Sequence, residues 1–375
     1  MHLSRLTLRH FRNLGTQDLE LPPEGVAIIG DNAQGKSNLL EAIYYLETFR
    51  SFRGARDDQL VAFGEGVFRV TGELVAVDGS EQPAAQVAAA YEKKGKRKKV
   101  TVDGVEPERV GDALGRVAAV VFSPADVELV SGGPSVRRRY LDIVLSLSAP
   151  GYLHALQEFR KILVRRNAAL KDGQPGAVVM AWDHGLVRSG AAVVEARRDW
   201  VQSRCRAFDE YYSAVSGGVG ARMAYRSSVH LDGARGEQDI AEAYRDALVA
   251  SSEREQRNGT TVVGPHRDDV VLRLEDEGDD LDLRDYGSGG QRRTAALALR
   301  LVEARTIRET RGREPMILLD DVFAELDGGR SERVLGLMER EETGQVVLTA
   351  PKEGDIRIRR DALPRWRIAD GRVAA

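Results

Sequence analysis

The chain has 375 residues, of which 42% are hydrophobic and 30% charged, and its formal net charge at pH 7 is −3. This is the composition of an ordinary globular protein, and the length allows two lobes. No apolar run approaches the roughly 20 residues of a membrane span. The N-terminus has no leader-like apolar segment, and the single cysteine, Cys205, excludes an intramolecular disulfide and a cysteine-rich zinc site. We therefore expect a cytoplasmic protein. The acidic net charge does not exclude nucleic acid as a partner, because that affinity depends on local phosphate contacts.

The first third of the chain is expected to form mostly strands. Apolar residues alternate at the N-terminus, again over 67–77 and 85–91, and a nearly continuous apolar run covers 116–122. One helical pattern interrupts them at 38–47, directly after the strand 26–29. Lysines and arginines crowd around Gly95, which predicts the tip of a hairpin.

The middle of the chain changes to helical spacing. Residues 134–215 carry Leu, Ala, Arg and Glu at helical intervals, with interruptions at 149–151 and 171–176. A further helix is expected over 238–255. Beyond it, a helix at 294–307 lies among short apolar strands, which are expected at 260–263, 270–274, 316–319 and 346–348.

These patterns predict an α/β fold of two lobes. Continuous apolar strands suit a parallel sheet that is covered on both faces. We expect residues 1–125 and 260–375 to co-fold into one lobe with a mixed or parallel sheet. Residues 126–259 are then an inserted, mainly helical arm lobe without a long coiled coil, because no sustained heptad run is visible.

The segment between the strand 26–29 and the following helix carries a complete Walker A pattern. Its residues, with the one that follows, are Gly30, Asp31, Asn32, Ala33, Gln34, Gly35, Lys36, Ser37 and Asn38. A glycine-rich turn at a helix N-terminus points backbone N–H groups into one concavity, where the helix dipole favours an anion. Lys36 is expected to reach the β- and γ-phosphates, and the Ser37 hydroxyl to bind Mg²⁺. The sequence therefore predicts a nucleoside triphosphate site in the lobe formed by the two ends of the chain.

The apolar strand 316–319 ends in Asp320 and Asp321, which is the Walker B pattern. Such a strand delivers its first aspartate to the Mg²⁺ held by the Walker A serine, so Asp320 and Ser37 are the expected metal ligands. We expect Lys36, Asp320 and Asp321 to be the catalytic residues, with ATP and Mg²⁺ as cofactors.

A serine-glycine turn opens the helix expected near Arg292. Its residues are Ser288, Gly289, Gly290 and Gln291. The turn resembles the signature of ATP-binding-cassette ATPases, and a helix N-terminus with glycines suits close approach to a phosphate. The resemblance implies that this turn binds the γ-phosphate held by a second copy of the chain, so that ATP drives the formation of a homodimer. Asp327 resembles the D-loop aspartate, which lies along the dimer interface of these proteins.

Further segments extend the resemblance to essentially the whole chain. They are Phe11-Arg12-Asn13, 30–42, Ser131-Gly132-Gly133-Pro134, Arg137-Arg138, Leu141-Asp142, 264–269, 288–299 and 318–327. Together they are similar to the RecF family of DNA replication and repair proteins, the compact relatives of SMC-type ATPases. The resemblance implies a weak, DNA-stimulated ATPase that acts as a switch. It also implies binding to duplex DNA and to single-strand/double-strand junctions, with RecO and RecR as partners in loading RecA for gap repair and the SOS response. From the sequence alone, His266 in the segment 264–269 has no assignable chemical role.

Three positions depart from the cassette ATPases. Asp321 stands where many of them have the glutamate that orients water, and its shorter side chain predicts slow hydrolysis. The strand end at 348–351 lacks their switch histidine. No glutamine follows the strand 116–122, so Ser123 or Asp126 is the candidate replacement.

Two basic runs are candidates for DNA contact. The hairpin run comprises Lys93, Lys94, Lys96, Arg97, Lys98 and Lys99, and the arginine triplet comprises Arg137, Arg138 and Arg139. Closely spaced cations neutralise phosphates without reading bases. The alternative for both runs is a solvated charged surface.

Two other functions stay open at this point. A cytosolic cassette ATPase without a DNA role would need a switch histidine or a transporter coupling surface, and neither is evident in the sequence. An ATPase–nuclease of the overcoming-lysogeny type would need a nuclease domain, and the stretch that follows Asp327 is too short for one.

Overall fold

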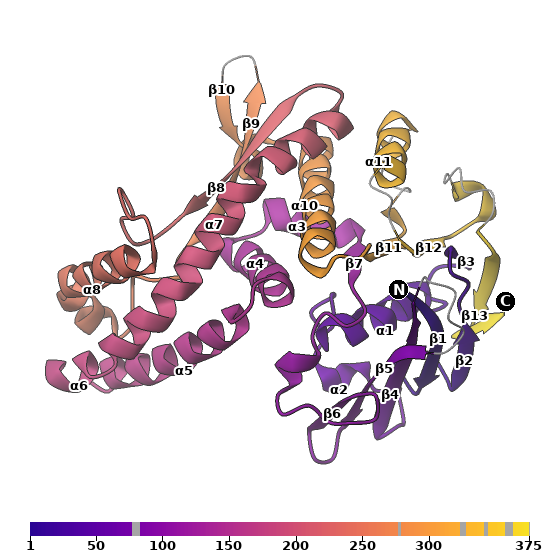
Figure 1. Ribbon diagram of the computed structural model, residues 1–375, viewed down its shortest axis with the longest axis horizontal. Helices are drawn as coiled ribbons and strands as arrows, with labels where there is room; N and C mark the ends of the chain where they lie inside the picture. Colours follow the sequence, from indigo (N-terminus) through magenta and orange to yellow (C-terminus); the bar gives the residue numbers. More distant parts are fainter. Residues whose placement is uncertain (77–82, 277–278, 323–327, 341–343, 357–362, 375) are drawn as a thin grey trace. The chain divides into compact units, whose positions relative to one another are not determined.

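A computed structural model describes residues 1–76, 83–276, 279–322, 328–340, 344–356 and 363–374. The chain divides into two compact units, whose elements are labelled in Figure 1. Unit 1 comprises Met1–Asp126, Ala214–Gly217 and Leu297–Ala375. Unit 2 comprises Val127–Ser213 and Gly218–Ala296.

This division differs from the boundary expected at residues 259 and 260. Residues 260–296 were assigned to the lobe formed by the chain ends, whereas the structure places them in unit 2. The cause is a three-stranded antiparallel sheet in which β9 (Asp269–Asp276) lies between β8 (Gly220–Arg226) and β10 (Asp279–Asp282). Strand β8 was not predicted, although Ala221 and Met223 alternate there with exposed residues.

Unit 1 contains a six-stranded sheet in the order β14-β13-β3-β12-β11-β7. The strands are β3 (Gly25–Ile29), β7 (Ala119–Phe122), β11 (Met316–Asp320), β12 (Val346–Ala350), β13 (Arg365–Ala369) and β14 (Arg372–Ala374). All neighbouring pairs are parallel except β13 with β14. Every residue of β7, β11 and β12 is buried, as expected for parallel strands that are covered on both faces. The predicted α/β class is confirmed.

A second sheet of unit 1 is antiparallel, with five strands in the order β2-β1-β4-β5-β6. They are β1 (His2–Arg9), β2 (Gln17–Glu20), β4 (Val67–Val75), β5 (Pro83–Glu92) and β6 (Arg97–Val102). Buried and more exposed residues alternate along β4, because successive side chains point to opposite faces of a strand. One face of this sheet therefore joins the core, and we call the other its outer face.

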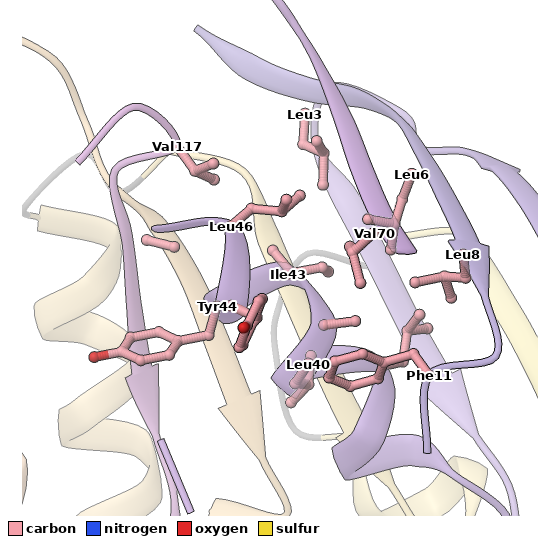
Figure 2. Close-up of a cluster of buried hydrophobic side chains, with 14 of the residues drawn as sticks. Leu3, Leu6, Leu8, Phe11, Leu40, Ile43, Tyr44, Leu46, Val70 and Val117 are labelled. Atoms are coloured by element: carbon pink, nitrogen blue, oxygen red, sulfur yellow. The ribbon is translucent and has the colours of Figure 1, made fainter. Parts of the chain in front are cut away.

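Helix α1 (Lys36–Thr48) contacts strands of both sheets and is buried along nearly its whole length. In Figure 2, its residues Leu40, Ile43 and Leu46 lie among side chains from β1 and β4. Because side chains of α1 are buried on all sides, packing fixes the position of the helix axis and of the helix N-terminus. Unit 1 also contains the short helix α2 (Asp57–Leu60) and α11 (Gly328–Arg340).

Unit 2 is mainly helical, as predicted. Its helices are α3 (Glu128–Ser131), α4 (Pro134–Ser148), α5 (Tyr152–Lys171), α6 (Gly176–Met180), most of α7 (Asp183–Ser216), α8 (Glu237–Asn258) and α9 (Leu283–Tyr286) (Figure 1). Helix α10 (Gly289–Arg311) begins in unit 2 and continues into unit 1. No helix of the described residues is long and apolar enough to cross a membrane.

The strand expected at 260–263 is not formed. The N–H of Thr261 donates to Asn167 Oδ1 (2.8 Å), and the N–H of Val262 donates to Glu255 Oε1 (2.9 Å). Side chains from α5 and α8 thus take the backbone donors that a strand would have used for pairing.

Candidate nucleotide-binding site

The Walker A residues form the connection between β3 and α1. Gly35 is the N-cap residue of α1 and adopts φ +113°. A Cβ atom at this position would lie 2.9 Å from Asn13 Oδ1. Because both the dihedral angle and the space exclude a side chain, only glycine allows the loop to turn directly into the helix.

Lys36 lies at the first position of α1, and only 5% of it is exposed. Its Nζ donates to the carbonyl oxygens of Gly30 (2.7 Å) and Asp31 (3.2 Å). The ammonium group is therefore held across the loop, at the helix end where the dipole is positive. This arrangement concentrates donors and positive charge, which is the requirement for binding phosphate.

The Walker B residues lie beside this loop. The Ser37 hydroxyl donates to Asp320 Oδ1 over 2.7 Å, at the end of β11. Thr349, on the neighbouring strand β12, places its hydroxyl 3.2 Å from Asp320 Oδ1 and 3.3 Å from Asp321 Oδ1. Burial raises the pKa of Asp320 against the hydrogen bond from Ser37, and the charge of Asp321 raises it further. A cation would relieve this cost, and oxygen ligands of this kind suit Mg²⁺.

Asp321 adopts φ +48°, in the left-handed region. The backbone turns there directly after β11, and the N–H of Asp321 donates to the Thr349 hydroxyl over 3.1 Å. Asp321 lines the same pocket as the Walker A loop, whereas Asp320 binds Ser37. Because the backbone of Asp321 turns in this strained conformation, the two adjacent carboxylates lie in different surroundings.

An open pocket of about 410 Å³ lies over the loop. Its lining is predominantly polar, and the residues are Asn13, Asn32, Ala33, Gly35, Lys36, Ser37, Asn38, Arg53 and Asp321. Asn13 and Arg53 were not predicted as site residues. Asn13 belongs to the segment 11–13 that carries part of the family resemblance. Arg53 lies in a loose cluster of arginines at 50–56, which contains no motif of the site.

A chain of hydrogen bonds connects Asn13 and Arg53 to the Walker A helix. Asn38 donates to Asn13 Oδ1 over 2.7 Å and accepts from Arg53 Nη1 over 2.8 Å. Behind it, the fully buried carboxylate of Glu41 receives both Nε and Nη2 of Arg12, at 2.9 and 3.0 Å. This paired contact is the geometry in which arginine and carboxylate interact most strongly. It holds the segment around Asn13 against α1.

Gln34 has a structural role as well as its place in the loop. Its side-chain carbonyl accepts from the N–H of Asp370 (2.6 Å), and its backbone carbonyl accepts from the N–H of Gly371 (3.0 Å). Both donors lie in the turn between β13 and β14. The C-terminal hairpin therefore anchors the Walker A loop.

The signature-like turn lies in unit 2, at the start of α10. The Ser288 hydroxyl accepts from the N–H of Gln291 (3.2 Å), and the Gln291 side chain accepts from the N–H of Ser288 (2.8 Å). This reciprocal pair is a capping box, which orders the turn without a ligand. Ser288 and Gly289 are exposed, and Gly290 is partly so. Asp327, the expected D-loop residue, lies outside the described residues.

Asp126 and Ser123, the candidate replacements for a glutamine, bond to each other. Asp126 Oδ2 accepts from the N–H of Ser123 over 2.7 Å, and Oδ1 accepts from Arg300 Nη2 over 2.6 Å. Arg300 also donates to Glu303 over 2.7 Å. The Asp126 carboxylate thus links the end of β7 to α10.

The hairpin run divides between the two faces of its strand. Arg97 and Lys99 are exposed, whereas Lys98 is paired in register with Tyr91 and thereby with Phe68 on the core-facing side. Its Nζ lies 2.8 Å from Asp57 Oδ2 and donates to the Phe49 carbonyl over 2.7 Å. The expectation of DNA contact is therefore corrected for Lys98, because the two-residue period of a strand turns it inward. Lys94 and Lys96 are exposed at the hairpin tip, and Lys93 is partly so.

The arginine triplet is divided in the same way by its helix. Arg137 is buried, and its Nε and Nη2 donate to the two carboxylate oxygens of Asp269 over 2.8 and 3.0 Å. Arg138 is half-buried and donates to the Asp268 carbonyl (2.7 Å), whereas Arg139 is exposed. The structure thus corrects the expectation of DNA contact for Arg137, whose guanidinium joins α4 to β9.

The fold and the sequence are similar to those of known proteins. The chain matches the family model for the RecF/RecN/SMC N-terminal domain over residues 2–363. It is 38% identical over 340 residues to the DNA replication and repair protein RecF of Halalkalibacterium halodurans, with 89% of each chain covered. It is 37% identical to the RecF protein of Geobacter sp. strain M21, with 93% of each chain covered.

Solved structures agree. The recombination mediator protein RecF with ATP, from the RecFOR pathway, matches with a TM-score of 0.89 and 32% identity, covering 100% of this chain and 97% of that chain. An SMC head domain of Pyrococcus furiosus shares the fold, with a TM-score of 0.55 at 16% identity and coverage of 99% and 95%. This chain is therefore a member of the RecF family within the RecF/RecN/SMC proteins.

Proposed function

We propose that this protein is an ATP-dependent DNA-binding protein of replication and recombinational gap repair. The observation that carries the proposal is the pocket lined by Lys36, Ser37 and Asp321, with Asp320 bonded to Ser37 beside it. The chain also holds a preordered signature turn at Ser288. The names of its relatives and of its RecF–ATP neighbour support the same assignment.

In this proposal, ATP lies with its phosphates on the Walker A loop. Lys36 would exchange its carbonyl partners for phosphate oxygens, since charge-assisted bonds to phosphate are the stronger ones. Ser37 and Asp320 would hold Mg²⁺, which supplies positive charge to the phosphates. Asp321 would orient the attacking water. Because aspartate is one methylene shorter than glutamate, hydrolysis would be slow, as suits a timed switch.

A second copy of the chain would complete the site. The Ser288 turn would bind the γ-phosphate held by the partner, so that ATP joins two heads and binding is linked to dimerisation by mass action. The dimer would clamp duplex DNA or a single-strand/double-strand junction, and DNA would stimulate hydrolysis. Its proposed partners are RecO and RecR, in the loading of RecA and the SOS response, and its proposed location is the cytoplasm.

The exposed part of the hairpin run is the proposed DNA surface. It comprises Lys93, Lys94, Lys96, Arg97 and Lys99, with Arg139 as a second contact. Cations that release counterions from phosphates give binding that weakens steeply with salt. Reversing the charges of Lys96, Arg97 and Lys99 should therefore lower both the affinity for DNA and its dependence on salt.

Sedimentation velocity with and without ATP tests the dimer. The wild type should dimerise with ATP and Mg²⁺, and Ser288→Arg should stay monomeric while it binds ATP with unchanged affinity. Ser252→Arg, an equal change at an exposed position of α8, is the matched control and should dimerise normally. Equal amounts of dimer with and without ATP would contradict the proposal. Cleavage of gapped DNA would instead favour a nuclease function.

A further inference from the structure

The outer face of the antiparallel sheet carries a row of cations that no motif contains. In the strand register, Arg9 of β1 pairs with Arg69 of β4, which pairs with Ala90 of β5, which pairs with Lys99 of β6. Residues paired in this way point to the same face. All three cations are exposed. We call Arg9, Arg69 and Lys99 the basic row. It crosses four strands, about 14 Å at ordinary strand spacing.

Cations outnumber carboxylates at one end of this face. Arg97 lies two residues from Lys99 on the same side of β6, where it pairs in register with Glu92 of β5. At the other end, Arg5 is paired with Asp18 (3.0 Å) and Glu20 (2.7 Å), so its charge is balanced. Lys99 has one acidic neighbour, Glu106, at 3.8 Å; both side chains are more than half exposed, and such pairs contribute little. Among the described residues, neither Arg9 nor Arg69 pairs with a carboxylate, and the basic row therefore exposes more positive than negative charge to solvent.

An exposed aromatic residue lies in the turn that joins the strands at this end. Phe63 has a relative exposure of 104%, the highest of the large hydrophobic residues in the described part of the chain. It lies in the turn between α2 and β4, where Gly64 has φ +82° and the N–H of Glu65 donates to the Ala62 carbonyl over 3.1 Å. Because the ring is exposed, it does not stabilise the fold by burying apolar surface.

The turn that carries Phe63 is fixed to the strands of the basic row. The N–H of Ala62 donates to the carbonyl of His10, the residue after Arg9, over 2.8 Å. On the other side, the N–H of Lys93 donates to the Gly66 carbonyl over 2.9 Å, and Lys93 Nζ to the Glu65 carbonyl over 3.3 Å. The ring is thus presented by an ordered loop, which lowers the entropy cost of using it as a contact.

We propose that this face binds the unpaired strand of a DNA substrate, with the basic row on its phosphates and Phe63 stacked on a base. The inference rests on the proposed DNA-binding function and adds a contact for single-stranded DNA. Aromatic rings stack on bases that are splayed out of a helix, while nearby cations follow the backbone. A lipid surface would also accept cations beside an aromatic residue. It would require a broad apolar face, and of the exposed large hydrophobic residues in the described part of the chain, only Val67 is near Phe63 in the sequence.

The test compares three DNA substrates by fluorescence anisotropy: a single-stranded oligonucleotide, a gapped duplex and a blunt duplex. Phe63→Ala should weaken binding to the first two about fivefold or more, because stacking is worth at least about 1 kcal/mol per base. Binding to the blunt duplex should not change. Phe63→Trp should restore affinity, whereas Phe63→Leu should not, since leucine has no ring. With 2-aminopurine in the gap, the wild type and Phe63→Trp should quench its fluorescence, and Phe63→Ala should not.

The basic row is tested by Arg9→Glu with Arg69→Glu. For single-stranded DNA, the slope of log affinity against log salt should fall by about 0.7 for each lost phosphate contact. Arg206→Glu, at an exposed site on α7 of unit 2, is the matched control and should leave the slope unchanged.

The possible failures are distinguishable. A wild type that binds none of the three substrates would overturn the proposed function. A wild type that binds the gapped duplex, with Phe63→Ala binding it equally well, would overturn this inference alone. Binding to phosphatidylserine vesicles that is lost in Phe63→Ala, with DNA binding intact, would overturn it in favour of a membrane contact.

Discussion

Two glycine-containing segments, one in each unit, show how a binding loop differs from a structural one. The Walker A loop contains Gly35 at φ +113°, and the segment 264–269 contains Gly264 at φ +117°. Both are polar and make unusual turns. The first faces an open pocket of about 410 Å³, whereas the second is enclosed by side chains of its own unit.

In the second segment, the protein satisfies its own polar groups. A Cβ on Gly264 would lie 2.1 Å from the Tyr244 hydroxyl oxygen. The Asp268 carboxylate accepts from the N–H and the hydroxyl of Ser228, both at 2.7 Å, and from the Tyr225 hydroxyl. Asp269 receives both nitrogens of Arg137. The carboxylates of this segment therefore serve packing within unit 2.

The comparison teaches which polar residues are available to a ligand. In the Walker A loop, Lys36 donates to two carbonyl oxygens of the loop itself, and it lines the open pocket. In 264–269, the partners come from α4 and the segment around β8, so releasing them would break the unit. A motif that is specific to a family can thus be specific for structural reasons.

Of the substitutions that test this comparison, Arg137→Ala is expected to have the largest effect, which is a loss of free energy of unfolding. The change leaves the buried Asp269 carboxylate without its main partner, which typically costs about 3–5 kcal/mol. Urea unfolding followed by the fluorescence of Trp200, whose ring lies 6.0 Å from that of Tyr140 on α4, should report the loss. ATP affinity should be unchanged.

Arg206→Ala is the control for this experiment, because that side chain is exposed and pairs only with Glu210 in the described structure. Its effect should stay below about 1 kcal/mol. A similarly small loss for Arg137→Ala would mean that the pair of Arg137 with Asp269 does not hold the segment 264–269 in place.

Lys36→Ala should have the opposite result, in which ATP affinity falls more than the free energy of unfolding does. Truncating one partner of a buried, hydrogen-bonded charge contact typically costs about 2–5 kcal/mol of binding free energy, roughly 30-fold to several thousandfold in affinity. We expect that loss in ATP affinity, measured with a fluorescent ATP analogue. The free energy of unfolding should fall by about 1–3 kcal/mol, since two hydrogen bonds to loop carbonyls disappear and each contributes about 0.5–1.5 kcal/mol. Lys94→Ala, at the exposed hairpin tip, should change neither quantity.

The elements of the candidate nucleotide site could be located in the sequence because their signals are local. Each signal is a contiguous segment, and its chemistry follows from the end of a strand or the start of a helix. These segments are Gly30 to Ser37, Asp320 with Asp321, and Ser288 to Gln291. Asn13 and Arg53 come from separate segments, and their approach to Asn38 depends on how the antiparallel sheet and α2 pack around α1. No spacing rule supplies that information.

The two basic runs show a second limit. Alternation within β6 predicts that Lys98 points away from Arg97 and Lys99, but the inner face is decided by pairing with β5. For Arg137, the helical spacing to Tyr140, Leu141 and Val144 does place it on the buried side of α4, and this signal was available in the sequence. Counting charges along the sequence ignores both the two-residue period of a strand and the period of a helix.

The smallest expected effect distinguishes the two units by pH. Burial lowers the pKa of His266 from 6.5 to about 4 despite its bond to the Thr261 carbonyl, and the charges of Arg267, Arg138 and Arg166 add to the shift. Burial raises the pKa of Glu47, on α1, from 4.5 to about 7, against the N–H donors of Ala118 and Val117 and the charges of Arg313 and Arg311. The two shifts have opposite consequences for stability.

As the pH falls from 7 to 5, the unfolded chain protonates His266 whereas the folded protein does not, so stability is lost. Over the same range the folded protein protonates Glu47 and the unfolded chain does not, so stability is gained. Each change amounts to about 2 kcal/mol. Relative to the wild type, His266→Gln should therefore become more stable on acidification and Glu47→Gln less stable, each by about that amount, in urea titrations at the two pH values. Glutamine at 266 keeps an N–H for the Thr261 carbonyl, so the comparison isolates the proton. If both variants followed the wild-type pH dependence, neither group would be held in the charge state that its surroundings impose.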